Sequence, residues 1–196
     1  VFGDHQVSNA LCAAAVAFEC GATGEQVAAA LAAAGPTSPS RMDVATRADG
    51  VTVINDAYNA NPDSMRAGLQ ALAWMSRPES GGERRRSWAV LGEMAELGDD
   101  TISEHDRIGR LVVRLDVSRL VVVGTGRALG AMHQGAVMEG SWGAEATRVD
   151  DADAALALLR AELRPGDVVL VKASNSAGLA ALATSLVEPA DGAASR

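Results

Sequence analysis

The sequence is poor in aromatic residues, lysine and cysteine. Aromatic residues make up 3% of its 196 residues, there are two cysteines, and Lys172 is the single lysine. No apolar run approaches the roughly 20 residues that a membrane helix needs, and the N-terminus has no signal-peptide pattern. The net charge of −8 at pH 7 argues against binding to bulk nucleic acid or to an anionic membrane surface. We therefore expect no nucleic-acid partner and no membrane insertion.

The residues that are abundant are those of a soluble globular protein. Hydrophobic residues make up 48% and charged residues 21%, which excludes disorder and fibrous repeats. The length allows one medium domain, or one domain and a piece of another. Cys12 and Cys20 lie in an Ala-rich stretch without zinc or redox spacing, and we predict reduced core cysteines of a cytoplasmic protein.

The first 34 residues predict two helices. The stretch from Asn9 to Cys20 is apolar on most faces, which predicts a buried helix, and Thr23 can cap a second helix from Gly24 to Ala34. Such a pair cannot bury its own apolar surface, so we expect it to be the end of a larger domain. The Gly-, Pro- and Ser-rich stretch that follows predicts a boundary between residues 1–38 and 39–196.

After this boundary, apolar strands alternate with helices. Strands are predicted at 51–55, 87–91, 120–123, 146–149 and 168–171, and helices at 63–75, 101–115, after 126, at 153–163 and at 177–187. This alternation predicts an α/β fold with a parallel sheet covered by helices on both faces. Such sheets bind ligands outside the carboxyl ends of their strands, which here are the loops 56–62, 92–100, 124–126 and 172–176.

The first of these loops is rich in polar side chains. Asp56 directly follows a strand and can accept hydrogen bonds from a ribose diol, while Asn59 and Asn61 can hold a peptide-like group. The alternative is a turn that caps the next helix, with Asp63 as the cap.

The second loop carries carboxylates and a histidine. Glu93, Glu96, Glu104 and His105 can bind a cationic group, but their spacing matches no metal motif and we predict no metal site. The alternative is an ordinary capping box that runs from Thr101 to Glu104.

The remaining two loops suggest anion binding. The two glycines of Gly124-Thr-Gly126 could form a turn that binds a phosphate or a carboxylate, but the rest of a dinucleotide-binding motif is missing. Lys172 at a strand end, with Ser174 and Ser176 opening a helix, predicts an anion pocket. The alternatives are an ordinary surface lysine and a serine that serves only as an N-cap.

Three further features have plain structural alternatives. Arg41 can clamp a phosphate or be a surface charge, and His5 is expected to be structural. The run Arg84-Arg85-Arg86 predicts a solvated loop before a strand.

Taken together, five segments resemble the Mur ligases. They are GDHQVSNAL at 3–11, SRM at 40–42, INDAYNANPDSM at 54–65, VLGEMAELG at 90–98 with Glu104-His105 after it, and DVVLVKAS at 167–174. The segments at 54–65 and 90–98 resemble the family member that joins D-alanyl-D-alanine to UDP-N-acetylmuramoyl-tripeptide. The last segment departs from the family's usual Gly-Ser-Arg after the lysine, because Ala173, Ser174 and Asn175 stand there, which puts an arginine contact to substrate in doubt.

The resemblance implies a fold and a reaction. It covers the end of the family's central ATPase domain and all of its third, Rossmann-like domain. It implies ATP and Mg²⁺ as cofactors, and UDP-N-acetylmuramoyl-tripeptide and D-alanyl-D-alanine as substrates joined through an acyl phosphate. The chain contains no phosphate loop of the Gly-x-x-Gly-Lys-Thr/Ser type, so we expect a fragment that is inactive alone, cytoplasmic and monomeric.

The resemblance also assigns residues. It implies that Asn9 contacts the adenine, that Asp56 contacts the ribose, and that Arg41 contacts the γ-phosphate as the catalytic residue. It further implies that the dipeptide or the acyl substrate faces a second group, which consists of Asn59, Asn61, Lys172 and Ser174.

Two other interpretations of the whole chain stay open. One is a related ligase such as a folylpolyglutamate synthetase, and the other is a stand-alone nucleotide-binding or regulatory module. In the favoured interpretation, residues 35–41 form a stiff hinge. Asn9 and Arg41 then lie on or near the ATPase side, and Asp56 and Lys172 lie on the third domain.

Overall fold

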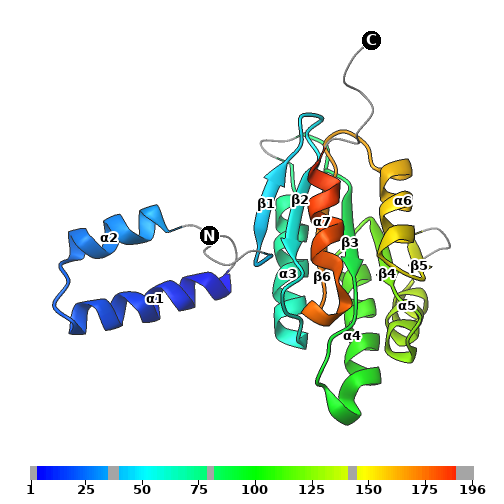
Figure 1. Ribbon diagram of the computed structural model, residues 1–196, viewed down its shortest axis with the longest axis horizontal. Helices are drawn as coiled ribbons and strands as arrows, with labels where there is room; N and C mark the ends of the chain where they lie inside the picture. Colours follow the sequence, from blue (N-terminus) through cyan, green and yellow to red (C-terminus); the bar gives the residue numbers. More distant parts are fainter. Residues whose placement is uncertain (1–3, 35–39, 79–81, 141–144, 189–196) are drawn as a thin grey trace.

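The computed structural model describes residues 4–34, 40–78, 82–140 and 145–188, and the side chains of the first helix from Val7 onward. The chain begins with two helices, α1 (Asp4–Glu19) and α2 (Gly24–Ala33), which form a hairpin that projects from a layered α/β body (Figure 1). As predicted, Thr23 caps α2, because its hydroxyl accepts a hydrogen bond from the Gln26 N–H at 3.3 Å. In the described part of the chain, no helix is both long and apolar enough to cross a membrane.

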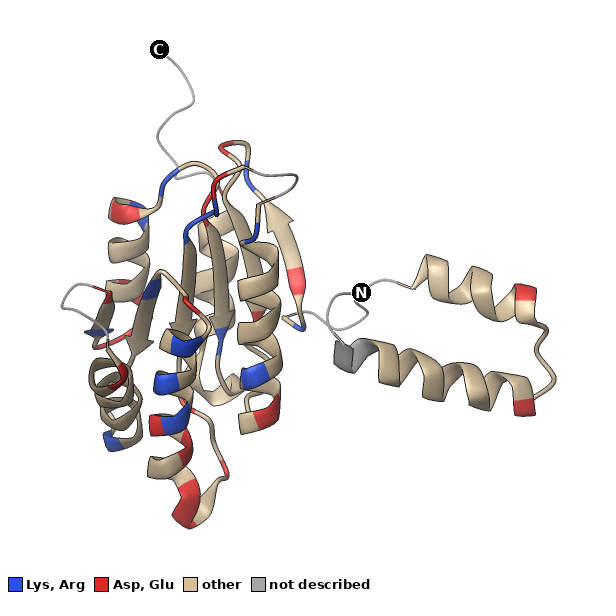
Figure 2. Cartoon of the chain, turned by 180° about the vertical axis from the view of Figure 1, so that it is seen from behind, with Lys and Arg blue, Asp and Glu red and all other residues tan. Residues whose placement is uncertain are grey.

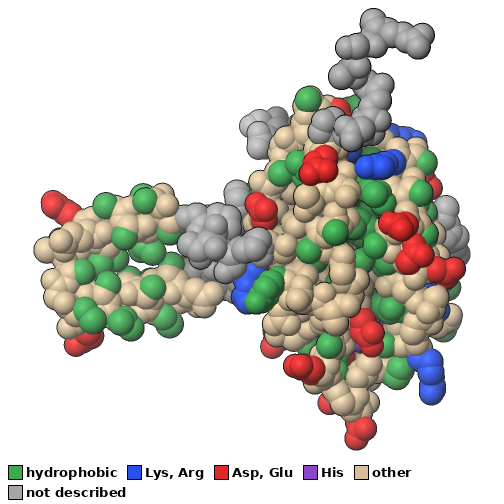
Figure 3. Space-filling view, viewed as in Figure 1, with side chains coloured by type: hydrophobic (Ala, Val, Ile, Leu, Met, Phe, Trp, Pro, Cys, Tyr) green, Lys and Arg blue, Asp and Glu red, His purple; other side chains and the backbone are tan. Residues whose placement is uncertain are grey.

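The prediction that the first helix is buried is wrong for this chain. Leu11 and Val16 are 65% and 64% exposed, and both Cys12 and Cys20 are exposed rather than in a core. Hydrophobic side chains therefore cover much of the hairpin surface (Figure 3), and its charges are few and acidic (Figure 2). The hairpin has the composition of an interior helix pair, but the described chain provides nothing that covers it.

The body is built on a six-stranded sheet in the order β1-β2-β6-β3-β4-β5. The strands are β1 (Asp43–Thr46), β2 (Thr52–Asp56), β3 (Ser87–Leu91), β4 (Arg119–Val123), β5 (Ala146–Val149) and β6 (Val168–Lys172). Five strands are parallel as predicted, while β1 pairs antiparallel with β2 at the edge. The sequence did not predict β1, because its four residues, Asp-Val-Ala-Thr, form neither an alternating apolar pattern nor a continuous β-branched run.

Helices cover both faces of the sheet, as the alternating pattern predicted (Figure 1). The helices are α3 (Pro62–Met75), α4 (Thr101–Arg114), α5 (Arg127–Glu139), α6 (Ala152–Glu162) and α7 (Leu179–Val187). The core next to α3, α4 and α5 takes Val168 and Leu170 from β6, and the core next to α6 and α7 takes Val169 and Val171. Successive side chains of β6 thus point to opposite faces of the sheet, and all five residues of this inner strand are buried.

The two helices α4 and α5 approach closely at two glycines. A Cβ on Gly109 would lie 1.9 Å from the carbonyl oxygen of Met132, and one on Gly135 would lie 2.3 Å from that of Asp106. Only glycine permits this backbone contact between the helices.

The arginine run forms a loop before β3, as predicted, but of its three arginines Arg84 alone is exposed, while Arg85 and Arg86 are partly buried. Arg85 donates hydrogen bonds to the Gly166 carbonyl at 2.6 Å and to the Thr52 hydroxyl at 2.8 Å. Arg86 pairs with the buried Asp167 at 3.1 Å and lies over the ring of Trp88. These arginines fasten the amino ends of β2, β3 and β6 together.

The connections define a crevice at the opposite end of the sheet. The helix after β2 covers one face, whereas the helix after the neighbouring β6 covers the other, so the two loops diverge between these strands. In open α/β sheets, ligands bind at such a point. The fold therefore singles out the loops that follow Asp56 and Lys172.

Candidate functional site

A cavity of about 400 Å³ opens beside the ends of β2 and β6. Its volume lies within the range of small-molecule sites. It is lined by Asn9, Arg41, Met42, Asp56, Asn59, Asn61, Asp63, Ser64, Ala67 and Lys172. The structure thus brings six of the seven predicted site residues to one cavity, and the seventh, Ser174, does not line it.

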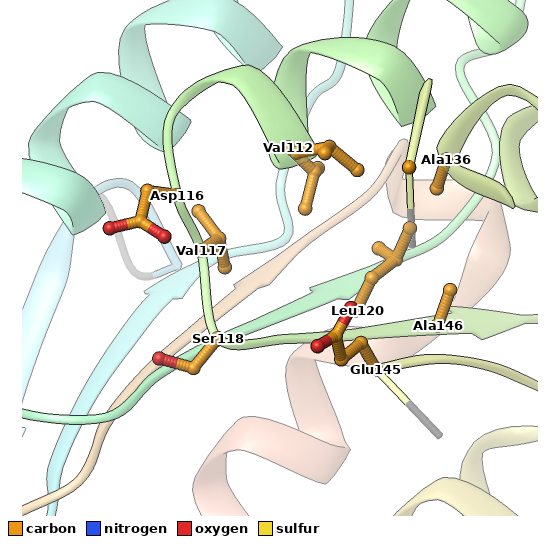
Figure 4. A pocket seen from close by; sticks show the side chains of 10 residues that line it. Val112, Asp116, Val117, Ser118, Leu120, Ala136, Glu145 and Ala146 are labelled. Carbon is orange, nitrogen blue, oxygen red and sulfur yellow. The ribbon is translucent and has the colours of Figure 1, made fainter. Parts of the chain in front are cut away.

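A smaller cavity of about 260 Å³ lies at the amino ends of β4 and β5 (Figure 4). Its lining combines aliphatic residues such as Val112, Leu120 and Ala136 with polar ones such as Ser118 and Glu145. The carboxylate of Asp116 at its edge is paired with Arg84. This cavity lies away from the carboxyl ends of the strands and contains none of the predicted site residues.

Asp56 ends β2 with both carboxylate oxygens engaged. Oδ1 accepts a hydrogen bond from the Met42 N–H at 3.1 Å, and Oδ2 accepts one from the Lys172 ammonium at 2.6 Å. Its side chain is 14% exposed. A carboxylate offers about four lone-pair positions, so Asp56 can still accept hydrogen bonds from a diol in the cavity.

Lys172 lies directly beside Asp56 in the parallel register and is 1% exposed. Its ammonium donates to the Asp56 carboxylate and, at 2.9 Å, to the backbone carbonyl of Asn59. The sequence suggested an open anion pocket or an ordinary surface lysine. The lysine instead forms part of the cavity wall, and its charge is compensated by the protein's own carboxylate.

The loop from Asn59 to Ser64 caps the start of α3 and also exposes a polar side chain at the cavity. Asn61, rather than Asp63, caps α3, because its side-chain oxygen accepts from the Ser64 N–H at 2.8 Å and Ser64 accepts from the Asn61 N–H at 3.0 Å. The expectation that Asp63 is the cap is wrong, and the asparagine is used because its amide oxygen reaches the third residue of the helix. The side chain of Asn59 is exposed at the cavity.

Arg41 is fastened to the α/β body. The Tyr58 N–H donates to the Ser40 carbonyl at 3.2 Å, the Met42 N–H reaches Asp56, and the Arg41 guanidinium lies 4.3 Å from the centre of the Tyr58 ring. Ser40 and Met42 both adopt left-handed backbone conformations, with φ of 58° and 49°. Arg41 was expected on or near the ATPase side. It belongs to the α/β body, but it lines the same cavity as Asn9 of α1 and so lies near the helical hairpin, while the hinge residues 35–39 lie outside the described residues.

Ser174 joins two loops instead of facing the cavity. It is buried, its hydroxyl accepts from the Ala95 N–H at 2.9 Å, and its own N–H donates to the Glu93 carbonyl at 2.9 Å. It begins the short 3₁₀ helix Asn175–Ala177 without a side-chain capping bond. The residue expected to bind substrate thus connects the loop after β6 to the loop after β3.

His105 holds the same loop from the other side, a role that the sequence did not reveal. It is fully buried, its Nε2 accepts from the Met94 N–H at 3.0 Å, and its Nδ1 lies 2.7 Å from the Thr101 carbonyl. These partners require the neutral tautomer with the proton on Nδ1. Burial lowers the pKa of His105 from 6.5, against the opposing effects of the Thr101 carbonyl, Glu93 and Glu104.

The predicted capping box at Thr101 is wrong. A 3₁₀ turn, Gly98–Asp100, precedes α4, and the Thr101 hydroxyl donates to the Gly98 carbonyl at 2.7 Å. Glu104 pairs with Arg107 instead of reaching back to the helix start. In the described ranges, no three His, Cys, Asp or Glu side chains form a group that could hold a metal ion.

The glycine turn after β4 is held by the protein itself. Arg148 donates to the carbonyls of Gly124 at 2.8 Å and Gly126 at 3.2 Å, and the Gly124 N–H donates to Val149. This turn lines none of the cavities described above. It connects β4 to α5.

Comparison with known proteins agrees with this geometry. The family model described as Mur ligase, glutamate ligase domain, matches residues 40–175. The UDP-N-acetylmuramoyl-tripeptide–D-alanyl-D-alanine ligase of Mycobacterium tuberculosis strain H37Rv is 73% identical over 199 residues, which is 95% of this chain and 38% of that protein. The enzyme of the same name from Mycobacterium leprae is 72% identical and is covered to 37%. The chain thus spans well under half the length of these curated relatives.

Solved structures show the same fold. A crystal structure of MurF from Acinetobacter baumannii superposes with a TM-score of 0.78 at 28% identity, covering 95% of this chain and 38% of that one. A folylpolyglutamate synthase/dihydrofolate synthase from Yersinia pestis shares the fold alone, with a TM-score of 0.57 at 18% identity over 84% of this chain and 34% of that one. The family model covers more than half of the sequence, and the chain therefore belongs to the Mur ligase family.

Proposed function

We propose that this chain is the C-terminal part of an ATP-dependent ligase that joins D-alanyl-D-alanine to UDP-N-acetylmuramoyl-tripeptide in peptidoglycan synthesis. The observation that carries the proposal is the 73% identity, over 95% of the chain, to a relative that bears this activity in its name. In this proposal, residues 1–38 end the central ATP-binding domain and residues 39–196 form the dipeptide-binding domain. The exposed apolar surface of α1 and α2 supports the boundary, since it suits the interior of a larger domain.

The cavity suits a nucleoside. Asp56 retains acceptor capacity for the two ribose hydroxyls, and the side-chain amide of Asn9 can pair with the edge of an adenine. Both residues line the same cavity. We therefore propose that these two residues bind the nucleoside of ATP.

Arg41 is the proposed catalytic residue. ATP supplies the phosphoryl group that activates the tripeptide carboxylate, and charge develops on the transferring oxygens. A guanidinium already held over Tyr58 can stabilise that charge without first being ordered. The amine of the dipeptide then attacks the acyl phosphate, which forms the amide and releases phosphate.

Asn59 and Asn61 are the proposed contacts to the dipeptide or to the acyl substrate. Both line the cavity, and the exposed Asn59 side chain offers one donor group and one acceptor. The side chains of Lys172 and Ser174 are already bonded within the protein, so a direct substrate contact by either has less support. The proposal places most of the magnesium ligands in the upstream part of the enzyme.

The activity is tested with the full-length protein in a coupled assay of ADP release, omitting each substrate in turn. We expect ADP formation to require both the tripeptide nucleotide and D-alanyl-D-alanine. ADP release that does not depend on the dipeptide would overturn the specific assignment. We further propose that the enzyme is cytoplasmic and monomeric, as its nucleotide substrates and the resemblance suggest.

The 196-residue chain provides a second test. We expect it to be inactive alone, because it lacks the phosphate loop and, in this proposal, most of the magnesium ligands. Titration calorimetry with ATP distinguishes the alternative of a stand-alone nucleotide-binding module. Tight binding by the isolated chain would favour the module.

A further inference from the structure

Lys172 combines three properties that a substrate-binding lysine does not need. It is the single lysine in a chain with sixteen arginines, it is 1% exposed, and its ammonium faces a carboxylate of the same protein. Burying an ammonium is costly unless a partner compensates its charge. The arrangement therefore indicates that Lys172 holds neighbouring groups of the protein in place rather than binding a substrate.

The path of the lysine side chain is built into α3. A Cβ added at Gly68 would lie 3.1 Å from Lys172 Cδ and 3.7 Å from its Cε, so the aliphatic stem passes directly against this glycine. The stem thus passes Gly68, and the ammonium at its end reaches the Asn59 carbonyl in the loop that follows β2. A wider guanidinium group would need more room at this position.

The ammonium fixes two groups of the cavity wall at once. It holds Asp56 Oδ2 at 2.6 Å and the Asn59 carbonyl at 2.9 Å. Asp56 Oδ1 in turn receives the N–H of Met42, the residue after Arg41. One buried charge thus orients the carboxylate and connects it to the segment that carries the arginine.

We propose that Lys172 is a positioning residue that presents the Asp56 carboxylate to the nucleotide and does not itself contact either substrate. This inference rests on the proposed function. The family resemblance placed Lys172 against the dipeptide or the acyl substrate, and the ion pair assigns it to the ribose side instead. Because Lys172 is proposed to act through Asp56, replacing the lysine should have no further effect on ATP binding once that carboxylate has been removed.

The decisive comparison uses D56N and the double variant D56N/K172M in the full-length enzyme. Both lack the carboxylate, and the double variant replaces the ion pair by neutral groups of similar size, which is the gentler change for folding. We expect D56N to raise the KM and the Kd for ATP about tenfold, the effect of one lost charge-assisted contact. D56N/K172M should match D56N in both constants to within about twofold, and the KM for D-alanyl-D-alanine should stay at the wild-type value.

The single variants complete the cycle. K172M should raise the KM for ATP as D56N does, and K172R should not restore it because of the contact with Gly68. Circular dichroism establishes that each variant is folded, and if K172M is not, the comparison of D56N with D56N/K172M still decides. Kd values for ATP from calorimetry provide a readout that does not depend on turnover.

Two results would overturn the inference. A higher KM for D-alanyl-D-alanine or the tripeptide in D56N/K172M than in D56N would mean that the lysine contacts substrate. A further loss of ATP affinity in the double variant would mean that it contacts the nucleotide directly. Failure of the proposed function is seen separately, as a wild-type enzyme whose ADP release does not depend on the dipeptide.

Discussion

Replacing His105 by glutamine should remove a pH dependence from the stability of this chain while keeping its fold. The imidazole is fully buried, and its Nε2 accepts the Met94 N–H at 3.0 Å. A glutamine oxygen can reach a similar position and accept the same hydrogen bond, but it does not titrate. Alanine keeps neither property and would leave a buried N–H unsatisfied, at a cost of about 1–3 kcal/mol.

The sign follows from the lowered pKa of His105 in the folded protein. Burial, the largest cause, opposes the charged form, while Glu93 and Glu104 act in the other direction. The unfolded chain therefore takes up a proton near pH 6.5 before the folded protein does. Stability is full above this pH and is lost as the pH falls through the lowered folded pKa. Protonation of the unfolded state alone sets a ceiling of about 1.4 kcal/mol lost at pH 5.5.

Urea unfolding followed by far-ultraviolet circular dichroism at pH 7.5, 6.5 and 5.5 measures this effect. The wild-type chain should lose up to about 1.4 kcal/mol more than His105→Gln between pH 7.5 and 5.5, with unchanged m-values. His105→Ala should be less stable than His105→Gln at every pH. Equal losses in the wild type and in His105→Gln would refute the argument that burial keeps His105 neutral.

Three further expectations concern packing and catalysis. Gly109→Ala should destabilise the chain by about 2 kcal/mol or more in urea unfolding, since its Cβ would meet the Met132 carbonyl at 1.9 Å. Gly130→Ala, whose Cβ meets only the end of a flexible arginine, should change stability by less than about 1 kcal/mol. In steady-state assays of the full-length enzyme, Asp56→Ala should mainly raise the KM for ATP, whereas Arg41→Ala should mainly lower kcat. The purified 196-residue chain should release no ADP above background in the coupled assay.

The sequence predicted the five parallel strands of the sheet. Runs of β-branched and aliphatic residues marked β2, β3, β4 and β6, because these strands are largely buried and their patterns are local. The pattern of β5 was weaker, since only Ala146 of its four residues is buried. The edge strand β1 was missed, because its residues alone do not predict a strand and its extended conformation is stabilised by pairing with β2. The first helix was predicted from Asn9 onward, whereas α1 begins at Asp4. It was also wrongly predicted as buried, because its composition suits a partner that the described chain does not provide.

The candidate site was predicted in position more than in detail. The rule that parallel strands end at one edge correctly gathered Asp56, Asn59 and Lys172 around one cavity. Lys172 and Asp56 are 116 residues apart in the sequence. Their pairing depends on β2 and β6 being neighbours in the correct register, and no short stretch of sequence predicts either the strand order or the register. The bonds of Ser174 were missed for the same reason, because they join the loop after β6 to the loop after β3. The role of His105 was missed although its partner Met94 lies in the loop just before its own helix, because the sequence did not show that the ring is buried against this loop.

The attachment of Arg41 changes how closure of the proposed enzyme must work. Ser40 and Met42 are bonded to Tyr58 and Asp56, so the proposed phosphate and ribose ligands share one body. Asn9, the proposed adenine ligand, lies on α1, across residues 35–39 in the chain. Asn9 nevertheless lines the same cavity as Arg41 and Asp56, so the proposed adenine contact already lies beside an arginine and a carboxylate that belong to one body. If the proposed enzyme closes around its substrates, a movement of α1 would change the adenine contact alone, and the ribose side would keep the geometry that the buried Lys172 gives to Asp56.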